Sequence, residues 1–60
     1  MSVKLTGKLF EVGNIDGGRG IRIEKDGEDI AITGMTIDEC RLAGTWFGED
    51  VEITITKVRL

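Results

Sequence analysis

An Asp-Gly pair at residues 26 and 27, between two runs of alternating apolar and polar residues, constrains the fold of this 60-residue chain more than any other feature. Such a pair accepts the positive backbone angles of a two-residue type I′ turn, so the runs 20–25 and 28–33 are predicted to form a β-hairpin. The four isoleucines of this hairpin then share one face, which needs a second layer to cover it. The predicted register pairs Lys25 with Glu28, Ile23 with Ile30 and Ile21 with Ile32.

Residues 3–12 are predicted to form a first strand whose inward face changes partway along it. Its apolar residues occupy odd positions up to Leu9 and even positions from Phe10 onward. Because side chains alternate along a strand, this change of phase indicates a β-bulge or a sharp coil, and Gly7 permits the bend.

A short helix is predicted over residues 37–43. Thr36 and Glu39 have the spacing of a capping box, and Gly44 suits the end of a helix. A helix of this length is not stable alone, so it is expected to cover one end of the β layer. The side chains expected to face inward are Ile37, Cys40 and Leu42.

Alternation over residues 51–58 predicts a last strand after a turn at 48–50. The order of elements is therefore three strands, a short helix and a strand. This order predicts an all-β fold, namely a small OB-like or SH3-like barrel or a curved antiparallel sheet of about four strands, with one short helix before the last strand. Residues 1–60 are expected to form a single domain.

Self-association is expected from the size of the core. A chain of this length buries only about 60% of the surface that its unfolded form exposes. Apolar residues make up 40% of it, yet there is one cysteine and no histidine, so neither a disulfide nor a zinc site can reinforce it. We therefore expect a homo-oligomer.

The lone cysteine is typical of a reducing compartment, so a cytoplasmic location is expected. Residues 1–12 lack the continuous apolar core of a signal peptide, and no run approaches membrane-spanning length, so no membrane partner is expected. The net charge is −3, but bases gather at residues 1–22 and at Lys57 and Arg59. If the first and last strands are neighbours, these bases form one positive flank; the alternative is solvated strand faces of mixed charge.

The chain contains Gly7-Lys8-Leu9 with Glu11-Val12, Ile21-Arg22-Ile23-Glu24 with Asp26-Gly27-Glu28, and Phe47-Gly48-Glu49-Asp50-Val51-Glu52-Ile53. Together these segments resemble the oligonucleotide-binding (OB) barrel, especially bacterial translation initiation factor 1 and S1-like RNA-binding modules. The resemblance implies an OB-like layout with nucleic acid as the partner class, and it implies that a strand edge left uncovered would be exposed backbone for another copy to pair with.

The glycine-rich segment at residues 13–20 is the first candidate site. Glycines let successive backbone N–H groups converge on an anion, and the guanidinium of Arg19 would add a planar fork for phosphate or carboxylate. The alternative is a long flexible hairpin connection that uses glycine for its turns. The residues predicted to bind are Asp16, Gly17, Gly18 and Arg19, with Arg22 on the following strand.

Trp46 and Phe47 are the second candidate site. On an extended segment, adjacent side chains point to opposite sides, so at least one of the two is expected in the core. Trp46 is the candidate for an interface anchor.

No catalytic or metal-binding constellation is present in the sequence. There is no cluster of zinc ligands, no repeated oxygen spacing of a calcium loop, and no nucleophile with a neighbouring base. We therefore expect no enzyme and no cofactor.

The predicted function is that of a homo-oligomeric inhibitor or adaptor that binds another macromolecule, in the first place a protein. Small acidic proteins without catalytic residues are often of this kind, including those encoded by phages. One alternative is a module that sequesters a nucleotide or oxyanion, or binds nucleic acid, through the glycine-rich segment. Another is a subunit of a larger assembly with no activity of its own.

Overall fold

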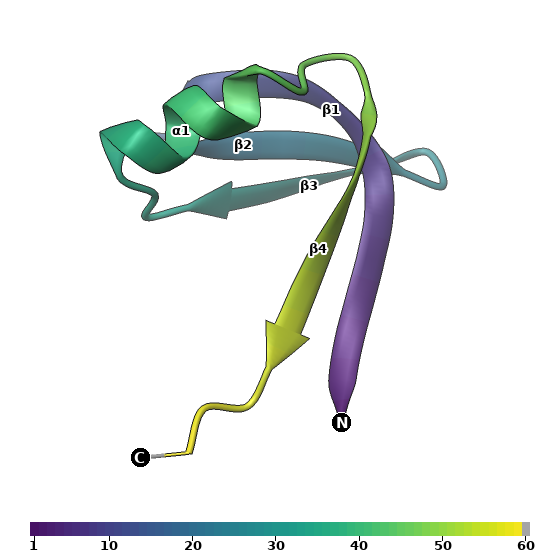
Figure 1. Ribbon diagram of the computed structural model, residues 1–60. Coiled ribbons are helices and arrows are strands. Elements are labelled where there is room, and N and C mark those ends of the chain that lie inside the picture. The colour runs from purple at the N-terminus through teal and green to yellow at the C-terminus, as the bar shows by residue number, and fades with distance from the viewer. Residues whose placement is uncertain (60) are drawn as a thin grey trace.

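Four antiparallel strands form a single sheet, and one short helix covers part of one face (Figure 1). The computed structural model describes residues 1–59. The strand order is β3-β2-β1-β4, so β3 and β4 are the edges and the sheet is open. The predicted fold class is thus confirmed, in its form as a curved sheet. The elements are β1 (Ser2–Ile15), β2 (Gly18–Lys25), β3 (Glu28–Thr33), α1 (Ile37–Gly44) and β4 (Asp50–Thr56).

The predicted hairpin of β2 and β3 is confirmed residue by residue. Its register pairs Lys25 with Glu28, Ile23 with Ile30 and Ile21 with Ile32. Asp26 and Gly27 form the two-residue turn, with φ of 52° and 80°, which are the left-handed angles that a type I′ turn requires.

A second hairpin replaces the loop expected at residues 13–20. The ladder of β1 and β2 continues to the pair Ile15 and Gly18, so that only Asp16 and Gly17 form the turn. Their φ angles, 49° and 87°, repeat those of the other turn. The expectation of a long loop here is therefore wrong, because an Asp-Gly pair closes a tight hairpin here as well.

The predicted irregularity of β1 is a β-bulge at Phe10. Leu9 pairs with Ile23 and Glu11 with Arg22, which leaves Phe10 without a partner on β2. The inward face changes at this point as expected. Figure 1 shows that β1 is strongly curved along its length.

The capping box predicted for α1 is present. The backbone N–H of Glu39 donates to Oγ1 of Thr36 at 3.1 Å, and the backbone N–H of Thr36 donates to Oε1 of Glu39 at 2.8 Å. The side chains of α1 that face the sheet are Cys40 and Ala43, both buried. The prediction for Cys40 is confirmed, whereas Ile37 and Leu42 are 51% and 58% exposed. Residues three apart share one side of this helix, so Leu42 lies off the side that carries Cys40 and Ala43. Ile37 is on that side, but it lies in the first turn, where it lines an open pocket.

The core lies between α1 and the middle of the sheet, and it is small. Leu9, Ile21, Ile23 and Ala43 are its buried members, and Val12, Ile30, Ile32, Met35, Val51 and Ile53 pack against them half-buried. Gly20 is buried beside the backbone of β3, where a Cβ atom would collide with the carbonyl group of Ile32.

A two-stranded ribbon, made of the first half of β1 and the whole of β4, projects from the body of the molecule (Figure 1). The body consists of the second half of β1 with β2, β3 and α1. Residues 2–8 of β1 pair with residues 50–56 of β4. Alternation places Val3, Leu5, Ile53 and Ile55 on one face of this ribbon. Among residues 1–59, no helix is long and apolar enough to cross a membrane.

Candidate functional site

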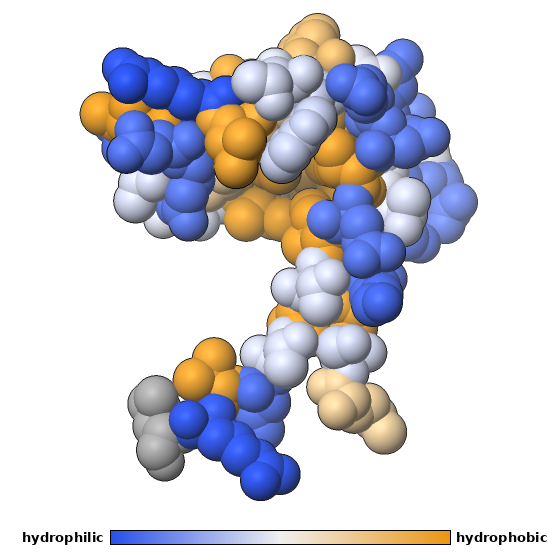
Figure 2. Space-filling model, in the orientation of Figure 1, coloured by the Kyte–Doolittle hydropathy of each residue, from blue (hydrophilic) through white to orange (hydrophobic). Residues whose placement is uncertain are grey.

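An apolar groove lies where the ribbon meets the body. It has a volume of about 260 Å³. Figure 2 shows apolar side chains gathered in the hollow between the body and the projecting ribbon. Two acidic residues, Glu39 and Glu52, also line it. The apolar lining residues are Leu9, Ile21, Met35, Leu42, Ala43, Trp46, Val51 and Ile53.

Trp46 lines this groove, while its neighbour Phe47 does not. Trp46 is 44% exposed and Phe47 is 61% exposed, so the expectation that at least one of them lies in the core is wrong. The physical reason is local: residues 45–48 form turns rather than an extended segment, with the backbone N–H of Trp46 donating to the carbonyl oxygen of Ala43 at 2.9 Å. Both aromatic rings are therefore carried at the surface, beside the end of α1.

A second pocket lies between the tip of the β1–β2 hairpin and α1. It has a volume of about 530 Å³. Two arginines line it, Arg19 from β2 and Arg41 from α1, together with the amide of Asn14, which is paired with Arg19 across the hairpin. The remaining lining residues are Gly13, Gly17, Gly18, Ile37 and Cys40.

This arginine pocket contains part of the site predicted from the glycine-rich segment. Gly17, Gly18 and Arg19 line it as expected, but the reason is the tight hairpin and not a loop of converging N–H groups. Arg41 was missed by sequence reasoning, because nothing in the chain before folding places the predicted helix beside Arg19. Within residues 1–59, no carboxylate lies within 4.0 Å of the Arg19 guanidinium, whereas Nη1 of Arg41 lies 4.0 Å from Oδ1 of Asp38.

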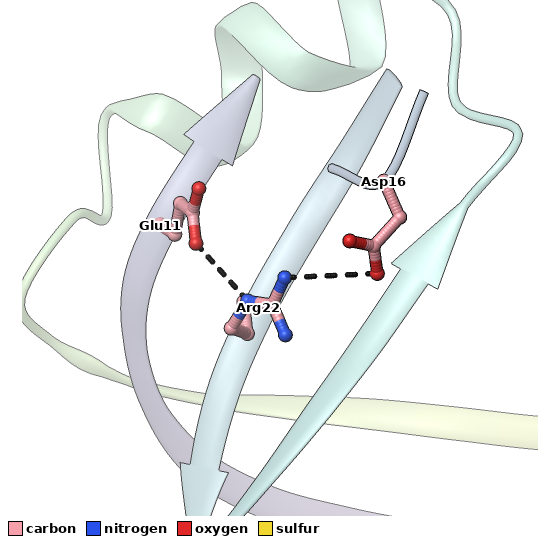
Figure 3. A network of polar contacts seen from close by, with 3 residues as sticks. All are labelled: Glu11, Asp16 and Arg22. Carbon is pink, nitrogen blue, oxygen red and sulfur yellow. Dashed lines mark hydrogen bonds and ion pairs between the residues drawn. The ribbon is translucent and has the colours of Figure 1, made fainter. Parts of the chain in front are cut away.

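Asp16 and Arg22 belong to a different part of the surface (Figure 3). Nε of Arg22 donates to Oε1 of Glu11 at 3.0 Å, and an Nη atom lies 3.8 Å from Oδ2 of Asp16. Arg22 alternates with Ile21 and Ile23, so it lies on the face of β2 opposite the core. Its guanidinium is engaged by two carboxylates, and it serves the hairpin rather than the arginine pocket.

The positive flank expected from neighbouring first and last strands is not formed. The strands are indeed neighbours, but Lys8 is paired with Asp50, and Glu52 lies opposite Thr6 between Lys8 and Lys4. Acids of β4 thus interleave with bases of β1 on the polar face of the ribbon. The alternative of mixed strand faces describes this part of the surface.

Metal-binding clusters of histidine, cysteine and carboxylate side chains are absent from the described residues. Cys40 is a buried free thiol, whose Sγ lies 3.8 Å from the carbonyl oxygen of Gly20.

The chain matches no protein-family model, and no match was found among the curated proteins or the solved structures. The geometry of the groove and of the arginine pocket therefore carries the functional argument that follows.

Proposed function

We propose that the protein is a non-enzymatic binding module, a homo-oligomeric inhibitor or adaptor that holds another protein in the apolar groove. The observation that carries this proposal is the exposure of large apolar side chains beside the groove in a chain with so small a core. Leu42 is 58% exposed and Trp46 is 44% exposed, and both line the groove. Contiguous apolar surface of this kind, rimmed by polar groups, is typical of protein interaction sites.

The chemistry of the lining defines the segment that fits. An apolar side chain of the partner would contact Trp46 and the aliphatic side chains of the groove floor. The acidic residues Glu39 and Glu52 also line the groove, so basic residues flanking that apolar anchor would be favoured. The partner class is thus a protein segment with an apolar anchor between lysine or arginine residues.

Substitution of Trp46 tests this proposal, and the adjacent aromatic residue supplies a matched control. Tagged wild-type protein, W46A and F47A are expressed at equal levels in the cells that carry the gene, and bound proteins are quantified by mass spectrometry. A partner held in the groove should lose roughly 30-fold of its binding in W46A, the effect of removing an interface hot spot, and should keep it in F47A. Equal recovery with W46A and wild type would contradict the proposal, provided that circular dichroism shows both variants folded.

The arginine pocket supports a second candidate function, the sequestration of a nucleotide or other oxyanion. Arg19, Arg41 and Asn14 line one pocket, and guanidinium and amide side chains are donors that phosphate recognition uses. Arg22 is not part of this candidate, because Glu11 and Asp16 engage it elsewhere.

Thermal stabilisation by inorganic phosphate, pyrophosphate and nucleotides tests the second candidate. A ligand present at about 100 times its dissociation constant stabilises a protein by about 2.7 kcal/mol. The resulting rise in melting temperature should be lost in R19A and in R41A and kept in R59A, which removes a distant arginine. The absence of any shift for the wild-type protein would exclude the pocket as an oxyanion site.

A further inference from the structure

The open sheet has two free edges, and their charges differ. β3 carries the acids Glu28 and Asp29 and no base. β4 is acidic where it begins, at Glu49 and Asp50, and basic just after it ends, at Lys57 and Arg59. Two copies of β4 placed antiparallel would bring each acidic end beside the basic end of the other copy, whereas two copies of β3 would bring only acids to their interface.

The backbone of β4 also has its free polar groups at defined residues. The N–H of Leu9 donates to the carbonyl oxygen of Glu49 at 3.0 Å, which makes Lys8 and Asp50 a non-hydrogen-bonded pair. By the alternation of an antiparallel ladder, the odd-numbered residues of β4 then direct their N–H and C=O groups toward β1. The even-numbered residues from Asp50 to Thr56 direct theirs to the open edge, where no described residue pairs with them.

One register satisfies the hydrogen bonds, the apolar face and the charges together. With Ile53 opposite Ile53 of the second copy, the even-numbered residues of both copies meet as hydrogen-bonded pairs, Glu52 with Thr54 and Asp50 with Thr56. Val51 lies opposite Ile55, so apolar residues meet across the edge on the face that already carries Val3 and Leu5. Glu49 lies opposite Lys57, and no like charges are directly opposed.

From this match we infer that the occupant of the β4 edge is β4 of a second copy of this chain, paired antiparallel about Ile53 into a continuous eight-stranded sheet. The inference deepens the homo-oligomeric part of the proposed function and rests on it. In an antiparallel sheet the directly opposed side chains share a face, so the apolar faces of both ribbons lie on the same side. Both apolar grooves then open on that side as well, and self-association leaves them accessible to a partner protein.

Disulfide trapping tests the register. In a Cys40→Ala background, Ile53→Cys places two cysteines at a non-hydrogen-bonded pair, where Cα atoms lie about 4.5 Å apart, within the range of a disulfide. Ile55→Cys is the matched control, because its two copies would be separated by four residues along the strand, about 13 Å. We expect a covalent dimer of the Ile53→Cys protein under mild oxidation and at least tenfold less from Ile55→Cys, judged by non-reducing electrophoresis.

A charge exchange tests the same pairing without cysteines. One variant makes β4 basic at both ends, by Glu49→Lys with Asp50→Lys, and the other makes it acidic at both ends, by Lys57→Glu with Arg59→Glu. Each should self-associate about tenfold more weakly than wild type by light scattering, and an equal mixture should recover a dimer, which also shows that both variants are folded.

The possible outcomes separate the inference from the proposal on which it rests. A wild-type dimer that is not trapped through Ile53→Cys, or is trapped equally through Ile55→Cys, would overturn pairing through β4 and leave a homo-oligomer built by another surface. A wild-type protein that is monomeric at every concentration would overturn both. Binding of a partner protein in the groove is judged separately, by W46A.

Discussion

Both halves of β1 carry apolar side chains, but the structure buries those of only one half. In the second half and its neighbour β2, Leu9 and Ile23 are 1% and 0% exposed beneath α1. In the first half and its neighbour β4, Val3 and Ile55 are both 56% exposed. The difference is the second layer: α1 covers the body, and no described part of the chain covers the far end of the ribbon, at Val3 and Ile55. Alternation therefore identifies an inward face, but the cover for that face comes either from this chain or from another molecule.

The largest expected difference between body and ribbon concerns two isoleucines. Ile23→Ala should lower the free energy of unfolding by about 2–5 kcal/mol, because it removes a fully buried side chain and leaves a cavity. Ile55→Ala, measured at concentrations too low for self-association, should cost less than about 1 kcal/mol. Urea denaturation of both variants measures the contrast. Equal losses would mean that the ribbon is packed as firmly as the body in the monomer.

A smaller effect is expected at Gly20, which lies against the backbone of the neighbouring strand β3. Gly20→Ala should cost about 1–3 kcal/mol, since its Cβ would meet the backbone of β3 at Ile32 and force β2 and β3 apart. Gly44→Ala is the control, because a Cβ at the end of α1 meets open space, and it should leave stability unchanged or raise it by up to about 1 kcal/mol. A Gly20→Ala protein as stable as wild type in the same urea titration would contradict this close approach of Gly20 to β3.

The two turns of the body should respond alike to loss of their glycines. Gly17 and Gly27 have φ of 87° and 80°, angles that cost other residues about 1–2 kcal/mol. Gly17→Ala and Gly27→Ala should therefore lower the melting temperature by similar amounts. If only Gly27→Ala lowered the melting temperature, the β1–β2 hairpin would be held by its neighbours rather than by its turn.

The smallest effect concerns the charge of Lys25, beside the Asp26-Gly27 turn. Nζ of Lys25 donates to Oδ2 of Asp26 at 2.9 Å, and this hydrogen bond and the carboxylate charge raise the pKa of Lys25. A raised pKa favours the folded state while Lys25 is charged, so the contribution is present at neutral pH and is lost as pH rises through the raised pKa. Asp26→Asn keeps a residue suited to the turn and should return the pKa of Lys25 toward about 10.4, as measured by NMR titration. An unchanged pKa in Asp26→Asn would contradict this assignment.

Local sequence signals were sufficient for the β2–β3 hairpin, the capping box of α1 and the bulge in β1. Each depends on residues close together in the chain: an Asp-Gly pair between isoleucines, Thr36 with Glu39, and the change of phase at Phe10. The β1–β2 hairpin carries the same Asp-Gly signal at Asp16 and Gly17, but sequence reasoning missed it. Its flanks contain Gly13, Gly18 and Gly20 instead of alternating isoleucines, so the turn was not distinguished from a flexible segment.

The parts of the candidate site that could not be predicted depend on contacts between distant segments. The proximity of Arg41 to Arg19 follows from the way α1 packs on β2, which no local pattern records. The exposure of Trp46 and Phe47 follows from turns after α1 that the sequence suggested to be extended. The groove itself exists only because β4 pairs with the projecting half of β1.

Because Phe10 is unpaired, a deletion in β1 has a different effect at Phe10 than at other residues of the strand. Removing Phe10 would join Leu9 to Glu11 and restore strict alternation, so every other side chain of the strand would keep its side of the sheet. Removing any single residue elsewhere in the ladder would exchange the inner and outer side chains of one half. Deletions in β1 are thus tolerated at one position, and the shortening there would straighten the strand and change the width of the groove, which makes Phe10 the natural place to reshape this surface by design.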